Sequence, residues 1–89
     1  MDKYFIGENS SGKTRRMLEA AKKSGAVVVC KNPSAMRRKA DNYGIWGVEF
    51  ESYGDIDFLM GKKIAVDELG EFFKYHFNTE LDAFTMTVD

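Results

Sequence analysis

Short apolar runs alternate along this chain with longer segments in which apolar residues recur every three or four positions. The run at residues 26–30 is continuous and rich in valine, which is typical of a strand buried on both faces. The run at 64–66 is shorter and ends in two acidic residues. Similar short runs predict three more strands, at residues 3–6, 48–50 and 84–88.

Helical spacing separates these runs. One helix is predicted over residues 13–23, because Met17, Leu18 and Ala21 fall on one face. A second helix is predicted to begin at Pro33 or Ser34, since proline suits the first turn, and to end at a glycine, Gly44. Shorter helical segments are predicted at residues 55–60 and 71–77.

Strands that alternate with helices imply a parallel sheet joined by right-handed crossovers. We therefore predict the α/β fold class, as a three-layer sandwich around a mostly parallel sheet of about five strands. With 89 residues, the chain is expected to form a single domain over residues 1–89. Its 44% hydrophobic and 30% charged residues are typical of a globular protein rather than a disordered one.

Charge and cysteine content narrow the functional classes. The formal charge of -1 gives no reason to expect nucleic acid or a membrane surface as a partner. The single cysteine, Cys30, allows neither an internal disulfide nor a zinc site built from cysteines. The sequence shows no charged-then-apolar leader and no long apolar run. We therefore expect a cytoplasmic protein.

Residues 7–14 match the P-loop (Walker A) pattern G-x-x-x-x-G-K-[ST] at every position. Gly7 and Gly12 can take backbone angles closed to other residues, so the loop can wrap and point its amide groups inward as an anion site. The helix that follows directs the positive end of its dipole to the same place. Lys13 is expected to contact the β- and γ-phosphates, and the Thr14 hydroxyl to reach Mg²⁺. The predicted nucleotide-binding residues are Gly7, Glu8, Asn9, Ser10, Ser11, Gly12, Lys13, Thr14 and Arg15.

A chance match in an ordinary turn is the alternative explanation of this motif. The position of the motif, after a predicted strand and at the start of a predicted helix, is the context that its mechanism requires. This context favours a phosphate-binding loop.

The apolar strand at 64–66 ends in Asp67 and Glu68, which is the Walker B pattern. A carboxylate at the C-terminal end of a parallel strand lies at the edge of the sheet where ligands bind. Asp67 is expected to hold Mg²⁺ together with Thr14, directly or through water. Glu68 should point the other way if the strand pleat continues, and could polarise a water or a substrate hydroxyl. Glu68 and Lys13 are therefore the predicted catalytic residues.

Other polar residues allow both functional and structural interpretations. Arg15 or Arg16 could flank the ribose or base, and Arg37 or Arg38 could act as an arginine finger. The alternative is a solvated helix face, which is what short charge runs usually form. His76 has no companion ligand nearby in the sequence and is better explained as a cation at the end of a helix.

The aromatic residues Phe72, Phe73, Tyr75 and Phe77 stand within six positions. Four rings so close together cannot all face inward on one helix. We expect at least one to be exposed or covered by another subunit. The region of Phe72 to Phe77 is thus a possible contact for a homo-oligomer or a protein partner.

With both phosphate motifs placed, the chain resembles the P-loop core of the thymidine kinase family. Residues 11–14 match the cradle, and residues 27–30 lead into Lys31-Asn32-Pro33 as in that family's strand-Lys-Pro stretch. Residues 64–68, followed by Phe72-Phe73, resemble its Asp-Glu box and phenylalanine pair, and residues 87–89 resemble the next strand ending. The resemblance implies a P-loop NTPase-like fold and a role for Glu68 as general base.

The chain also departs from that family. Its phenylalanine pair stands one residue farther from Asp67-Glu68, and it contains neither the nucleoside-enclosing lasso nor the zinc-binding segment. We therefore interpret it as a minimal relative of the core, of a kind that would fit a phage or mobile element.

Three functions follow from these motifs. The first is binding of ATP and Mg²⁺, with slow hydrolysis at most. The second is a nucleoside or nucleotide kinase, which needs an acceptor site that only oligomerisation or residues 43–57 could supply. The third is a non-catalytic regulatory or interaction module on a P-loop fold. Adenine is the expected base only because the chain has no Asn-Lys-x-Asp stretch of the kind that selects guanine.

Overall fold

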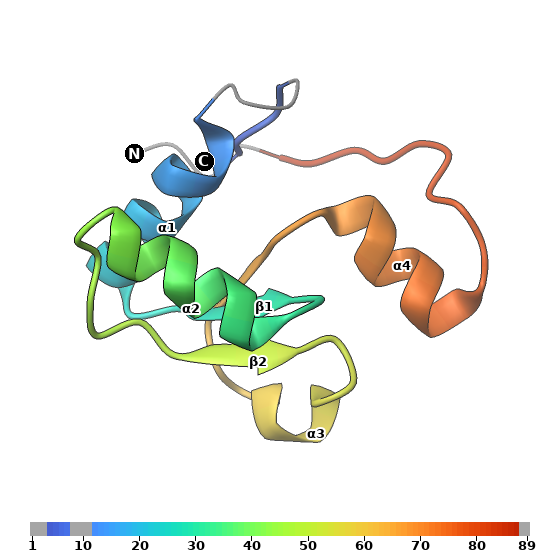
Figure 1. Ribbon diagram of the computed structural model, residues 1–89. Helices are drawn as coiled ribbons and strands as arrows, with labels where there is room; N and C mark the ends of the chain where they lie inside the picture. The colour runs from blue at the N-terminus through green and yellow to red at the C-terminus, as the bar shows by residue number, and fades with distance from the viewer. Residues whose placement is uncertain (1–3, 8–11, 88–89) are drawn as a thin grey trace.

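The computed structural model describes residues 4–7 and 12–87 of the chain, and Figure 1 shows their arrangement. Helices and strands alternate along the described residues, as the apolar pattern predicts. Their order is α1 (Lys13–Ser24), β1 (Val27–Cys30), α2 (Pro33–Asn42), β2 (Phe50–Ser52), α3 (Ile56–Leu59), β3 (Ile64–Val66) and α4 (Leu69–Phe77).

The strands form an open parallel sheet in the order β2-β1-β3. Strand β1 lies in the centre, with Val28 opposite Phe50 of β2 on one side and opposite Ala65 of β3 on the other. All four residues of β1 are buried, which explains its unbroken apolar sequence. The predicted α/β class and parallel sheet are therefore confirmed.

The two terminal strands predicted from the sequence are not seen in the part of the chain that the structure describes. The described parts of these segments, residues 4–6 and 84–87, have no strand structure, so the described sheet has three strands rather than about five. Ile6 is 82% exposed and Phe84 is 55% exposed. An apolar run becomes a strand only when it forms hydrogen bonds with a neighbouring strand. The sequence of a short run does not show whether such a neighbour exists.

The remaining differences are small. Strand β2 begins at Phe50 and ends at Ser52, about two residues later than predicted. Helix α4 begins at Leu69, two residues earlier than predicted, because the turn that starts it is made by Glu68. These shifts lie within the usual uncertainty of element boundaries.

Two hydrophobic clusters cover the two faces of the sheet. On one face, α1 and α2 pack through residues such as Leu18 and Ala40 against Val28 of β1. On the other face, Val27 and Val29 pack with Tyr53 and Leu59. Alternate residues of β1 thus supply both clusters, as the two-residue period of a strand requires.

Helices α1 and α2 both pack on the first of these faces. Helix α2 follows β1 directly and is capped by Asn32, whose side-chain oxygen accepts a hydrogen bond of 3.1 Å from the Ala35 amide. After α4, the chain leads back toward the N-terminal residues in the view of Figure 1. No helix within the described ranges has the length and apolar character needed to span a bilayer.

Candidate functional site

Lys13, the lysine of the predicted Walker A motif, lies at the start of α1. Gly12 precedes the helix with a φ of 80°, a conformation that glycine adopts without strain. Among the residues that the structure describes, no side chain caps this end of α1, and its first turn contains no acidic residue. The Lys13 ammonium donates a hydrogen bond of 2.8 Å to the Gly7 carbonyl, so the two ends of the motif meet. Thr14 follows in the first turn and is half-buried.

Part of the predicted cradle lies outside the described residues. This part comprises Glu8, Asn9, Ser10 and Ser11. Their predicted role in phosphate binding therefore stays a prediction, and the described geometry is that of Gly7, Gly12, Lys13 and Thr14.

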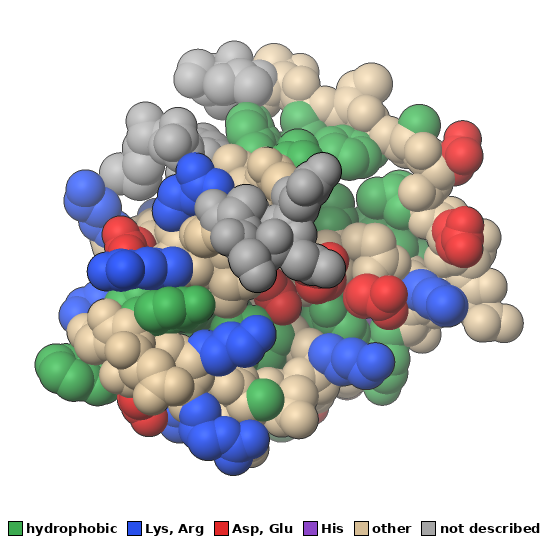
Figure 2. Space-filling view, turned by 45° about the horizontal axis from the view of Figure 1, so that its top comes forward, with side chains coloured by type: hydrophobic (Ala, Val, Ile, Leu, Met, Phe, Trp, Pro, Cys, Tyr) green, Lys and Arg blue, Asp and Glu red, His purple; other side chains and the backbone are tan. Residues whose placement is uncertain are grey.

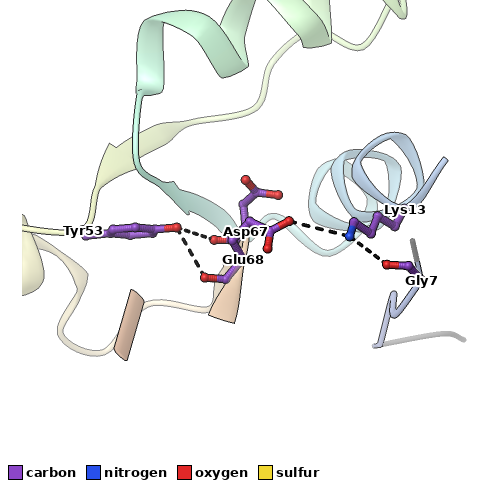
Figure 3. A network of polar contacts seen from close by, with 5 residues as sticks. All are labelled: Gly7, Lys13, Tyr53, Asp67 and Glu68. Atoms are coloured by element: carbon purple, nitrogen blue, oxygen red, sulfur yellow. Dashed lines mark hydrogen bonds and ion pairs between the residues drawn. The ribbon is translucent and has the colours of Figure 1, made fainter. Parts of the chain in front are cut away.

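Asp67 and Glu68, the carboxylates of the predicted Walker B motif, lie where β3 ends. The Asp67 amide donates to the Val29 carbonyl at 2.9 Å, so Asp67 still continues the sheet ladder. Glu68 leaves the strand: its φ of 57° and ψ of 72° are left-handed, and it is the N-cap of α4. This backbone costs a residue with a side chain about 1–3 kcal/mol. The predicted pleat does not extend to Glu68, but the two carboxylates still point to different sides (Figure 3).

Lys13 and Glu68 bring the two motifs together. The Lys13 ammonium and the Glu68 carboxylate are 3.7 Å apart, with the two side chains 24% and 54% exposed. Figure 3 shows the ammonium between this carboxylate and the Gly7 carbonyl. Exposed pairs of this kind contribute only about 0.2–1 kcal/mol to stability, so the contact is weak enough to be exchanged for a ligand.

Electrostatics at Asp67 favour a nearby cation. Burial, followed by the charge of Glu68, raises the pKa of the Asp67 carboxyl above its ordinary value, while Lys39 and Lys13 oppose the shift. A divalent cation at this position would offset the electrostatic cost of keeping the adjacent Asp67 and Glu68 carboxylates charged. The described residues contain no cluster of three or more His, Cys, Asp or Glu side chains suited to a metal. Mg²⁺ bound with a nucleotide commonly uses one or two carboxylates and completes its ligand set with phosphates and water.

Tyr53 is a site residue that the sequence analysis missed. Its hydroxyl donates to the Asp67 carbonyl at 2.6 Å and lies 3.4 Å from the Glu68 carbonyl (Figure 3). Burial, together with the charges of Asp67 and other neighbours, raises the pKa of Tyr53 to about 12, so the hydroxyl stays protonated. Tyr53 stands in a segment without a recognisable motif, and only the folded chain brings it to residues 67 and 68.

Arg15 and Arg37 make contacts at the protein surface. Arg15 forms an ion pair of 3.0 Å with Glu19 and lies over the Tyr43 ring at 5.6 Å. Arg37 lies over the Phe50 ring at 5.1 Å. These contacts fit the interpretation of solvated helix faces. On the face shown in Figure 2, Lys and Arg side chains are spread widely.

Cys30 is buried, and burial determines the ionisation of its thiol. It lies at the end of β1, 1% exposed, and burial raises the pKa of its thiol to about 11. The thiolate that reacts or binds metal is therefore disfavoured.

Comparison of the chain with protein-family models, with curated proteins and with solved structures finds no match.

Proposed function

We propose that this protein binds ATP with Mg²⁺ through a P-loop and hydrolyses it slowly at most. The observation that carries the proposal is the position of Lys13, which lies between the Gly7 carbonyl and the Glu68 carboxylate. The sequence motifs for phosphate and for Mg²⁺ are thus in contact at one edge of a parallel sheet, where ligands of open α/β sheets bind.

Each residue has a role in this proposal. The amides of the loop from Gly7 to Thr14 and the start of α1 would surround the phosphates. Lys13 exchanges its present contacts for the β- and γ-phosphates. Asp67 and Thr14 hold Mg²⁺, which neutralises phosphate charge when bound. Glu68 orients a water at the γ-phosphate.

The proposal extends to the fold of the P-loop sandwich and to the kinship with the thymidine kinase core. In support, β3 pairs with β1 along one edge, and its other edge has no strand among the described residues. Five strands would require residues 3–6 and 84–88 to pair in this sheet. Their described parts, 4–6 and 84–87, do not do so here.

An interaction module is the second candidate, and α4 is the observation that favours it. None of the nine residues of α4, all of them described, is buried. Tyr75 and Phe77 are each 63% exposed, as expected for at least one ring of this region. Exposed apolar surface of this kind is typical of contacts between proteins or subunits.

Calorimetry with ATP and Mg²⁺ tests the proposal. Lys13→Ala should weaken binding by at least about 100-fold, or about 2.7 kcal/mol, because it removes charge-assisted contacts to phosphate. Circular dichroism should show the fold retained, since the Lys13–Glu68 pair is partly exposed. Lys22→Ala, at the far end of α1, is the matched control and should bind as the parent does.

Equal affinity in Lys13→Ala and the parent would refute a P-loop function. If the parent binds ATP and Lys13→Ala does not, ATP turnover distinguishes the three candidate functions. Steady hydrolysis without an acceptor supports an ATPase, acceptor-dependent turnover supports a kinase, and tight binding without turnover supports a module.

A further inference from the structure

Glu68 has a backbone conformation that its residue type does not favour. Among the described residues other than glycine, only Glu68 and Asn78 have a positive φ, at 57° and 51°. Asparagine tolerates this conformation, and Asn78 ends α4 in the usual way. Glutamate has no such tolerance, so surrounding contacts must hold Glu68 in place.

Tyr53 supplies contacts of the required kind. Its side chain is 4% exposed, and its hydroxyl reaches both carbonyls of the turn, at 2.6 Å for Asp67 and 3.4 Å for Glu68. The Glu68 carbonyl also accepts the Phe72 amide at 3.1 Å, the first hydrogen bond of α4. One hydroxyl therefore contacts the backbone where the strand ends and the helix begins.

The ring of Tyr53 also packs against α4. It meets Phe72 edge-to-face, with ring centroids 5.5 Å apart, and lies 6.0 Å from the Tyr75 ring. The neighbouring Gly54 permits this approach, because a Cβ there would lie 2.8 Å from the Tyr75 hydroxyl. Tyr53 thus contacts both the carboxylate-bearing turn and the aromatic helix.

We infer that Tyr53 is a positioning residue, whose hydroxyl holds the turn from β3 into α4 and so keeps the Glu68 carboxylate beside Lys13. The position of α4 and the state of the phosphate site are then linked through this turn. The consequence for nucleotide rests on the proposed function, whereas the positioning itself is a property of the chain without ligand.

Tyr53→Phe tests the inference, because it removes the hydroxyl and keeps the ring. Amide hydrogen exchange in the ligand-free protein should become at least fivefold faster at Phe72. The Met36 amide is the internal control, since it makes the same first-turn hydrogen bond in α2, to Asn32 at 3.0 Å, and should change less than twofold. Tyr75→Phe is the matched variant from the same aromatic cluster and should leave both amides unchanged.

Acylation of lysines, followed by mass spectrometry, tests the link to the phosphate site. In Tyr53→Phe, Lys13 should react at least twofold faster relative to Lys22, because Glu68 no longer stays beside it. Unchanged exchange at Phe72 would overturn the inference. Faster exchange without a change at Lys13 would overturn it too, since the turn would have loosened without moving Glu68.

Adding ATP and Mg²⁺ to the parent separates this inference from the proposed function. Protection of Lys13 from acylation is expected if nucleotide binds there. Lack of protection would count against nucleotide binding, while the ligand-free comparison of the variants would still decide the role of Tyr53.

Discussion

Removing the charge of Glu68 should strengthen the binding of ATP at the proposed phosphate site in the absence of Mg²⁺. The Glu68 carboxylate lies 3.7 Å from the Lys13 ammonium. A phosphate that binds the Lys13 ammonium would lie at a similar distance from the Glu68 carboxylate. The two negative charges would repel each other. We therefore expect Glu68→Gln to bind free ATP more tightly than the parent does.

The distance sets the size of the effect. Two unit charges 3.7 Å apart interact by about 1 kcal/mol in water and by several times more in a protein interior. Glu68 is 54% exposed, so the value in water is the appropriate one. About 1 kcal/mol corresponds to about a fivefold gain in affinity. The same exposure limits the loss of folding stability to less than about 1 kcal/mol.

Calorimetry with ATP and a chelator, at low and at high salt, measures this gain. The difference between variant and parent should shrink as salt rises, because exposed charges are screened. Glu71→Gln is the matched control: it removes the same charge from the exposed first turn of α4. Equal affinities of Glu68→Gln and the parent at low salt, or an equal gain in Glu71→Gln, would refute the reasoning.

Two further predictions concern Asp67 and α4. The raised pKa of Asp67 means that the folded chain holds this proton more tightly than the unfolded chain does, so stability is lost as pH rises through the raised value, above the ordinary 3.8. Asp67→Asn should therefore melt at a higher temperature than the parent at pH 7, with a smaller difference near pH 4. It should also weaken Mg²⁺-dependent ATP binding. An equal or lower melting temperature of the variant at pH 7 would contradict the charge argument. In sedimentation with and without ATP and Mg²⁺, the chain should self-associate. The double variant Tyr75→Ser, Phe77→Ser should be monomeric, because these two rings are exposed apolar surface of α4. A parent that stays monomeric at high concentration in both conditions would exclude a homo-oligomer.

Some elements could be predicted from the sequence because local patterns determine them. The continuous valine-rich run at β1 is typical of a buried strand, and Met17, Leu18 and Ala21 of α1 are buried as the helical spacing requires. The start of α4 could not be predicted, because it depends on a left-handed Glu68. A glutamate does not indicate a left-handed backbone, and contacts with distant parts of the chain hold Glu68 in that conformation.

The same distinction applies to the candidate site. Residues 7–14 and 64–68 could be proposed as a site from the sequence because each stretch is contiguous, and the folded chain brings Lys13 within 3.7 Å of Glu68. Tyr53 could not be recognised, because its partner Asp67 is fourteen positions away and presents a backbone carbonyl, which every residue has. Contacts to the backbone leave no signature in the sequence of the acceptor.

The central position of β1 bears on how the chain folds. Its neighbours in the sheet come from later in the chain, with Val28 paired to Phe50 on one side and to Ala65 on the other. Each pairing closes a long loop, and parallel pairing of this kind is slow to form because the entropy of closure is lost before contacts compensate. Neither hydrophobic cluster is complete without β1, since Val28 belongs to one and Val29 to the other. The two clusters should therefore form together and melt in a single cooperative transition.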